Sequence, residues 1–198
     1  MSKVTDFFMD MSDLETERLI LRKFHLEDVN DVYEYGSDEE VNKYVKFETY
    51  KSLHDAQNYI DYVLTKYSKG EIAPWAIIHK KDNKMIGYIE FIEIKEDHYW
   101  GEISYVFNRN YWGKGLGSEA VKEILNLAFN IFELNRVQAR CINENIASYR
   151  IMEKVGMKYE GTSKEAMLKD NNFHDIVQYA ILKKEHYILN NRFIKEVD

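Results

Sequence analysis

Residues 111–120 read YWGKGLGSEA, with glycines at the alternate positions 113, 115 and 117 directly before a long amphipathic pattern. Glycine tolerates positive φ and, because it lacks a Cβ, lets backbone N–H groups approach a ligand closely. The first amides of the following helix have no intrahelical partner, and the helix dipole adds partial positive charge at the same point. The pattern therefore predicts an anion site of the kind that holds phosphate groups.

Other glycine-rich motifs fit these residues less well. A P-loop requires Gly-x-x-x-x-Gly-Lys-Ser/Thr, a string that the chain does not contain. A dinucleotide-binding turn has a glycine where this chain has Ser118, and its ribose-binding acid lies about 20 residues further on, whereas Glu144 is too distant. An ordinary turn does not account for three glycines at a helix start, since each costs about 0.5–1 kcal/mol relative to alanine inside regular structure.

Composition restricts the class of protein. The 198 residues include nine glycines and one proline, with no repeat or linker-like stretch, so we expect a single domain over 1–198 with its core at about 16–183 and an unassigned tail at 184–198. The net charge of −7 argues against a nucleic-acid or anionic-membrane binder; it suits cationic partners, or serves solubility alone.

A single cysteine, Cys141, and the lack of an export signal or a membrane-spanning apolar segment favour a cytosolic protein. The six histidines have no metal-ligand spacing, so no metal is expected.

Hydrophobic periodicity predicts an α/β (α+β) fold with a mixed, mostly antiparallel central sheet of about seven strands flanked by helices. Strands are expected at 18–24, 74–79, 85–94, 98–108, 136–142, 157–166 and 174–183. Helices are expected at 27–35, from the N-cap Ser52 to the stop at Gly70, at 117–132 and at 146–155. The long helix should bury the apolar side chains of Ala120, Val121, Ile124, Leu125, Ala128 and Ile131. The glycine loop would follow the fourth strand, where a sheet could splay and admit a ligand.

Three stretches carry a resemblance to a known family: ETERLILR at 15–22, WGKGLGSEA at 112–120, and NIAS at 145–148 followed by EKVG at 153–156. From about residue 16 to 183 the chain resembles the GNAT superfamily of acetyl-CoA-dependent N-acetyltransferases, in particular the branch of RimJ/RimL-like ribosomal-protein N-terminal acetyltransferases. The superfamily usually has Gln or Arg where this chain has Trp112, a change that leaves the backbone donors in place.

The resemblance implies a GNAT (acyl-CoA N-acyltransferase) fold, acetyl-CoA (coenzyme A) as cosubstrate and direct attack by a primary amine in a ternary complex. A protein N-terminus is the first choice of acceptor: at pH 7 its α-amino group loses a proton at a cost of only ~1.4 kcal/mol, against ~4.6 kcal/mol for a lysine. A small amine (a polyamine, an aminoglycoside or an amino-acid derivative) and a non-catalytic CoA-binding sensor are the alternatives. The sequence leaves a homodimer open.

The resemblance also implies catalytic residues. Glu102, on the strand before the glycine loop, is the candidate general base, and a solvent-facing strand carboxylate is the alternative interpretation. Ser148 is the candidate proton donor to the leaving thiolate, and Tyr149 is the other donor considered. Asn145 and Ser148 could equally serve as helix caps.

Cofactor contacts are expected at the start of the long helix and along the two neighbouring strands. Backbone groups of the fourth strand should pair with the pantetheine amides like an added strand. The expected cofactor-binding residues are Val106, Phe107, Trp112, Gly113, Lys114, Gly115, Gly117, Ser118, Asn143, Asn145 and Ser148. The aromatic residues Tyr33, Tyr35, Tyr44, Phe47 and Tyr50 could line an acceptor groove or simply pack in the core.

Overall fold

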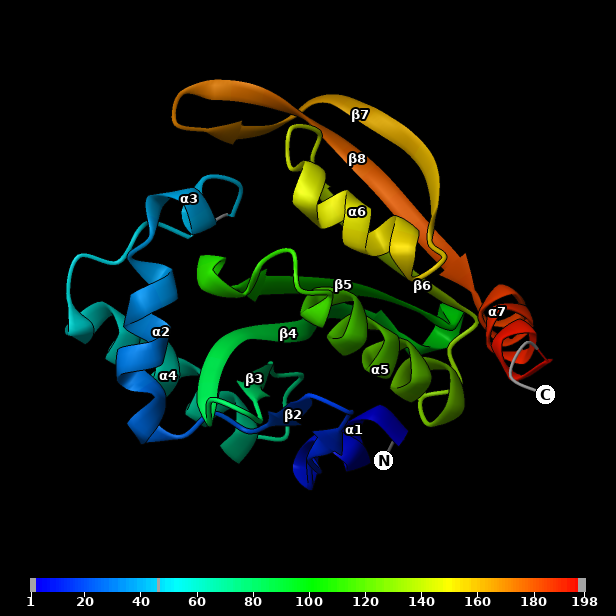
Figure 1. The fold of residues 1–198 in the computed structure, drawn as a ribbon, viewed down its shortest axis with the longest axis horizontal. Helices are drawn as coiled ribbons and strands as arrows, with labels where there is room; N and C mark the ends of the chain where they lie inside the picture. Colours follow the sequence, from blue (N-terminus) through cyan, green and yellow to red (C-terminus); the bar gives the residue numbers. More distant parts are fainter. Residues whose placement is uncertain (1–2, 46, 196–198) are drawn as a thin grey trace. The chain divides into compact units, whose positions relative to one another are not determined.

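The computed structural model describes residues 3–45 and 47–195 (Figure 1). Within these residues, eight strands form one sheet in the order β1-β2-β3-β4-β5-β6-β8-β7. The pair β5–β6 is parallel, and the pairs β1–β2, β2–β3, β3–β4, β6–β8 and β7–β8 are antiparallel. The predicted fold class, a mixed and mostly antiparallel sheet flanked by helices, is confirmed. The additional strand is β1, which has only two residues and therefore leaves no pattern to detect.

The boundaries follow the predicted ones within a few residues. The strands are β1 (Leu14–Glu15), β2 (Leu19–Arg22), β3 (Trp75–His79), β4 (Lys84–Lys95), β5 (Trp100–Phe107), β6 (Arg136–Ile142), β7 (Lys158–Lys169) and β8 (Asn172–Leu182). The α-helices are α1 (Lys3–Met9), α2 (Val29–Gly36), α3 (Glu39–Asn42), α4 (Leu53–Ser68), α5 (Leu116–Asn130), α6 (Ile146–Lys154) and α7 (Lys183–Lys195). Short 3₁₀ turns, η1 (Leu26–Asp28), η2 (Glu96–His98) and η3 (Arg109–Tyr111), precede α2, β5 and the glycine loop.

One prediction about the helices needs correction. Ile131, expected to face inward on the long helix, is 52% exposed because α5 ends one residue earlier, at Asn130, and the periodic pattern no longer applies. The other five apolar residues of that pattern are buried. The tail that the sequence left unassigned begins with α7, whose Lys183 N–H bonds to Asn135 O.

The chain divides into two compact units, residues 1–92 with 104–123 and residues 93–103 with 124–198. The prediction of one domain over the whole chain stays a prediction.

In the first unit, α2 and α4 lie side by side (Figure 1). Strands β2 and β3 carry the buried side chains of Leu19, Leu21 and Ile77. The predicted start of α4 is confirmed by a capping box, in which Asp55 Oδ2 accepts from Ser52 N at 2.9 Å. Gly87 has φ +149°, and a Cβ there would lie 2.0 Å from Val106 O. Only glycine therefore lets the backbone of β4 come this close to the end of β5.

In the second unit, the first part of β5 pairs with β6, and β6 pairs with β8 along its whole length. Helix α6 contacts β6, β7 and β8, and the ring of Tyr149 stacks on that of Tyr179 with centroids 6.1 Å apart. His186 of α7 is buried beside Asn126, with Nε2 3.0 Å from Asn126 Oδ1. Among the described residues, none of the helices combines the length and apolar character needed to span a bilayer.

Candidate active site

The glycine loop has the backbone geometry that the sequence predicted. Gly113 and Gly115 have φ of +73° and +77°, in the left-handed region that favours glycine. Helix α5 begins at Leu116, one residue before the predicted start. Its first i to i−4 hydrogen bond runs from Glu119 N to Gly115 O, so the amides of residues 116–118 precede the intrahelical ladder. A Cβ at Gly113 would meet no atom within 4 Å. These features fit a diphosphate, which needs several converging N–H donors and open space.

Asn108 fixes the chain where β5 ends and the loop begins. Its side chain is buried, its N–H donates to Ile86 O at 2.7 Å, and its Nδ2 donates to Glu34 Oε1 at 2.8 Å. Its Oδ1 also accepts from Asn110 N at 2.9 Å. Asn108 thus joins the turn η3 to both β4 and α2 with three hydrogen bonds.

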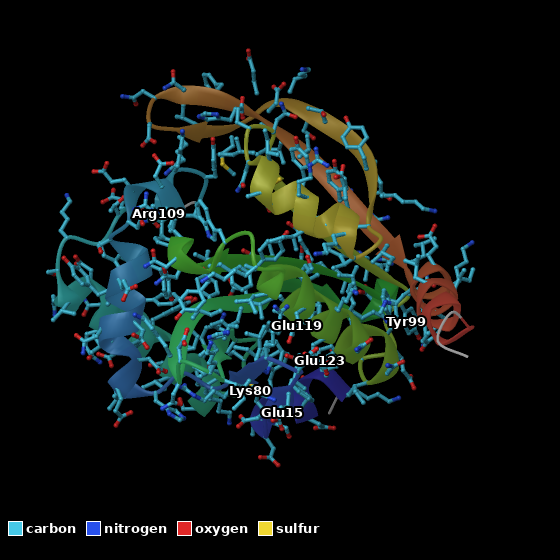
Figure 2. All side chains as sticks on the ribbon, viewed as in Figure 1. Glu15, Lys80, Tyr99, Arg109, Glu119 and Glu123 are labelled. Carbon is cyan, nitrogen blue, oxygen red and sulfur yellow. The ribbon has the colours of Figure 1, made fainter. Side chains whose placement is uncertain are left out.

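Glu119, on the first turn of α5, connects the helix to the N-terminal strands, and its position is labelled in Figure 2. Its Oε1 accepts from Thr16 Oγ1 at 2.6 Å and from Arg18 N at 2.8 Å, and its Oε2 accepts from Arg18 Nε at 2.7 Å. Arg18 also donates from Nη1 to Lys114 O inside the loop, at 3.0 Å. We call these contacts of Thr16, Arg18 and Glu119 the loop brace.

The carboxylate of the loop brace is held ionised. Partial burial acts to raise the pKa of Glu119, but the hydrogen bonds from Thr16 and Arg18 outweigh it and lower that pKa below its ordinary value. The brace joins the first and second stretches of the family resemblance, which are about 100 residues apart in sequence.

The backbone predicted to bind pantetheine lies beside this loop in the same unit. Phe107 O accepts from Trp112 Nε1 at 2.8 Å, and Val106 O faces Gly87. A carbonyl oxygen has two lone pairs, so Phe107 O can accept a second donor. Trp112 is 42% exposed, and Lys114 Nζ lies 4.8 Å from the centroid of the Tyr111 ring. The side chain of Ser118 is buried, and Gly117 lies within the first turn of α5.

In the second unit, Glu102 is buried rather than solvent-facing, with its side chain 5% exposed. Its Oε1 accepts from Arg140 Nε at 2.8 Å, and its Oε2 accepts from Gln138 Nε2 at 2.8 Å. The pairing of β5 with β6 sets Glu102 opposite Gln138, which explains the second contact. Both oxygens of this carboxylate are therefore engaged, and the role of Glu102 as a base stays a prediction.

The start of α6 combines capping with the predicted donor groups. Asn145 is its N-cap, and Asn145 Oδ1 accepts from Ser148 N at 3.1 Å, so the capping interpretation is confirmed for Asn145. The Ser148 side chain and the Tyr149 amide both interact with Cys141. Asn143 is exposed and donates its backbone N–H to Asp175 O at 2.9 Å.

Burial raises the pKa of Cys141 to about 11, against the smaller opposing effect of its contacts with Ser148 and Tyr149. A raised pKa favours the protonated thiol at neutral pH and so disfavours a role as a nucleophile.

The loop brace and Asn108 are the site contributions that sequence reasoning missed. Thr16, Arg18 and Glu119 fall inside the quoted motifs, so their presence was visible, but only tertiary structure pairs them. Glu34, the partner of Asn108, shows no sequence signal at all. Among residues 3–45 and 47–195, there is no group of three or more His, Cys, Asp or Glu arranged to hold a metal ion.

Comparison with known proteins agrees with this arrangement. The family model described as "Acetyltransferase (GNAT) domain" matches residues 18–158. An uncharacterized N-acetyltransferase, YnaD, of Bacillus subtilis (strain 168) is 39% identical over 173 residues, which cover 87% of this chain and 98% of that protein. A GNAT-family acetyltransferase structure from Bacillus anthracis is 35% identical with a TM-score of 0.78, covering 88% of this chain and all of that one.

A structure of RimL, a ribosomal L7/L12 alpha-N-protein acetyltransferase in complex with coenzyme A, is 18% identical with a TM-score of 0.76 over 86% of this chain and 98% of its own. At that identity the likeness concerns the fold alone. GNAT proteins use acetyl-CoA, and the glycine loop lies within the matched region. The chain belongs to the GNAT acetyltransferase family, and it is an N-acetyltransferase.

Proposed function

We propose that the protein transfers the acetyl group of acetyl-CoA to the α-amino group of a protein N-terminus, by direct attack of the amine in a ternary complex. The observation that carries the cosubstrate part of this proposal is the glycine loop, with positive φ at Gly113 and Gly115, braced by Glu119 against Thr16 and Arg18. When bound there, acetyl-CoA supplies an activated acyl group as a thioester.

The loop amides and the backbone beside them are proposed to hold the cosubstrate. The amides of Gly117 and Ser118, at the start of α5, would bind the diphosphate. Backbone groups of Val106 and Phe107 would pair with the pantetheine amides, as in strand addition. Asn143, Asn145 and Ser148, which the sequence also predicted, are likewise proposed as cosubstrate-binding residues.

The choice of an N-terminal amine rests on energetics and on the resemblance to the RimJ/RimL-like branch. An α-amino group has a pKa of about 8, so deprotonation at pH 7 costs ~1.4 kcal/mol and a modest base suffices. RimL, which shares the fold at 18% identity, is a ribosomal L7/L12 alpha-N-protein acetyltransferase.

Glu102 is the candidate base taken from the sequence. Each of its oxygens accepts one hydrogen bond, Oε1 from Arg140 and Oε2 from Gln138, and each keeps a second lone pair at which a proton could bind. Replacing Glu102 by Gln tests this role: if Glu102 is the base, the pH profile of the rate shifts while coenzyme A affinity stays nearly intact. An unchanged profile removes it from that role.

The acceptor is identified by thiol release from acetyl-CoA with a panel of peptides with free N-termini, polyamines, aminoglycosides and amino-acid derivatives. Acceptor-dependent thiol release with peptides supports the proposal. Thiol release with small amines only would show that the acceptor is a small amine and not a protein N-terminus. Tight coenzyme A binding without acceptor-dependent thiol in any case would favour a sensor. Labelled acetyl-CoA incubated with cell extract then reveals which species becomes modified.

A further inference from the structure

Four tyrosines and one carboxylate gather on one face of β4 in the first unit. Tyr88 and Glu90 are two residues apart on β4, so their side chains share a face of the sheet. The ring of Tyr88 lies 6.4 Å from that of Tyr35 on α2 and 5.8 Å from that of Tyr59 on α4. Tyr50, before α4, packs its ring on Gly36. Burial, together with the electrostatic effect of the Tyr50 hydroxyl group, raises the pKa of Tyr35, Tyr59 and Tyr88. We call Tyr35, Tyr50, Tyr59, Tyr88 and Glu90 the tyrosine–glutamate cluster.

Two members of the cluster have unused polar capacity. The Tyr35 hydroxyl is buried, with the residue 1% exposed, and it has no hydrogen-bond partner among the described residues. The Glu90 side chain is half-buried, and within residues 3–45 and 47–195 it makes no hydrogen bond or ion pair. Polar groups withdrawn from water in this way carry a free-energy cost unless something pairs with them. Hydrogen-bond donors from a ligand would satisfy either group, and positive charge would also suit Glu90.

The charged and titratable neighbours of Glu90 come from two elements. Burial raises the pKa of Glu90 to about 7, although the positive charge of Lys66 on α4 acts to lower it. Tyr59 and Tyr67 of α4 and Tyr88 of β4 also face the carboxylate, and burial raises the pKa of each. The hydroxyls of these tyrosines therefore stay protonated at neutral pH. The Tyr67 hydroxyl is already engaged, since it donates to Pro74 O.

We propose that the tyrosine–glutamate cluster receives the amino group of the acceptor as a primary ammonium ion, with Glu90 as its counter-ion. Ring faces attract cations, and hydroxyl oxygens such as that of Tyr35 accept N–H donors. An anionic ligand would be repelled by Glu90 and by the negative ring faces, and an apolar ligand would leave the carboxylate and the Tyr35 hydroxyl unpaired. This inference rests on the proposed function and specifies how its acceptor is recognised.

Two members of the cluster, Tyr88 and Glu90, are on β4, the strand next to the predicted pantetheine-binding backbone. Asn108 N–H donates to Ile86 O, and Gly87 closely approaches Val106 O, so β4 runs beside residues 104–107 within the same unit. Glu90 follows Gly87 by three residues along β4. An amine held at Glu90 is thus presented from the strand beside the one that would bind the acyl carrier.

The cluster also accounts for activation of the amine, with Glu90 in place of Glu102 as the base. The ammonium passes one proton to a Glu90 oxygen and becomes a neutral amine, whose nitrogen attacks the thioester carbon. The C–N bond forms as the C–S bond breaks, the second amine proton ends on the thiol sulfur, and Glu90 returns its proton to solvent. A carboxyl group with a pKa near 7 is well matched to such a proton exchange at neutral pH.

The test measures the titration of Glu90 directly, by the ¹³C signal of its side-chain carboxyl group, assigned by its loss in Glu90→Gln. The probes are spermidine and a tetrapeptide with a free N-terminus, each compared with its N-acetylated form, on the full chain with coenzyme A present. We expect an amine that the enzyme acetylates to lower the titration midpoint from about 7, and the acetylated form to leave it unchanged. Whichever probe lowers the midpoint identifies the source of the ammonium.

Steady-state kinetics provide the second measurement. Glu90→Gln should lower kcat/KM for the amine by about 100-fold or more and remove the ionisation near pH 7 from its pH profile. Tyr35→Phe removes a buried hydroxyl without a partner while the ring keeps its packing, so it should raise KM for the amine about three- to tenfold with a melting temperature equal to or above that of wild type. Glu93→Gln, on the same strand but paired with Lys95, is the matched control and should behave as wild type.

Each result bears on a different part of the reasoning. If wild type acetylates an amine while the Glu90 midpoint does not move and Glu90→Gln keeps its KM and pH profile, the cluster is not the acceptor site, although the proposed function stands. If Glu90→Gln does not fold, Tyr35→Phe serves as the test instead, and an unchanged KM for the amine in that variant overturns the proposal. If wild type binds coenzyme A but acetylates none of the amines, the proposed function fails and the inference fails with it.

Discussion

Loss of the loop brace should weaken coenzyme A binding although Glu119 is not expected to touch the ligand. In Glu119→Gln, one oxygen can still accept from Thr16 Oγ1 and Arg18 N, but an amide N–H₂ would face Arg18 Nε where Oε2 now accepts at 2.7 Å. A hydrogen bond to a charged group contributes about 1.5–3 kcal/mol, and the 42% exposure of the Arg18 side chain reduces this to roughly 1–2 kcal/mol.

That free energy is lost in two measurable ways. A chain of this size loses about 2–4 °C of melting temperature per kcal/mol, so a decrease of roughly 2–8 °C is expected. Arg18 would also hold Lys114 O less firmly, and the loop amides would sample conformations that do not converge on the diphosphate. We expect coenzyme A affinity to weaken about three- to tenfold, since tenfold corresponds to about 1.4 kcal/mol.

Isothermal titration calorimetry with coenzyme A, together with thermal unfolding, measures both effects. The matched control is Glu15→Gln, which changes an exposed carboxylate that pairs with Lys80 at 2.6 Å in the same unit and should leave coenzyme A affinity unchanged (Figure 2). An affinity for coenzyme A that stays within twofold of wild type in Glu119→Gln, despite a lower melting temperature, would refute the view that the brace organises the loop.

Two further predictions concern packing and pH. Gly36→Ala would bring a Cβ to 2.2 Å from Tyr50 Cδ2, so it should lower the unfolding free energy measured by chemical denaturation by about 1–3 kcal/mol. It should also weaken acceptor binding, because the Tyr50 ring would be displaced. Stability equal to that of wild type would contradict the close packing. The hydrogen bonds of Arg136 lower the pKa of Glu160 from 4.5 to about 2, so its contribution to stability is present above pH 4.5 and is lost as pH falls towards 2. Denaturation curves of Glu160→Gln should accordingly depend less on pH than wild type between those values, and equal slopes would exclude this ion pair as a source of acid sensitivity.

Local sequence determined most of the elements and the conformation of the glycine loop. Alternating glycines before an amphipathic run specify a left-handed turn and a helix start whatever the rest of the chain does, because φ preference and unpaired first-turn amides are local properties. The N-cap Ser52 and the strand at 136–142 were predictable for the same reason. The two-residue strand β1 and the short helix α1 were not, because so few residues show no period.

Only the tertiary structure decided which side chains meet. Glu102 and Gln138 became partners through the parallel pairing of β5 with β6, and Glu119 met Arg18 across 101 positions of sequence. Glu90 showed no signal in the sequence, since a carboxylate in a strand is ordinarily a solvated residue; its character comes from α4 and the tyrosines that keep water from it. Backbone preference acts between neighbours along the chain, whereas desolvation and pairing depend on groups that folding brings together.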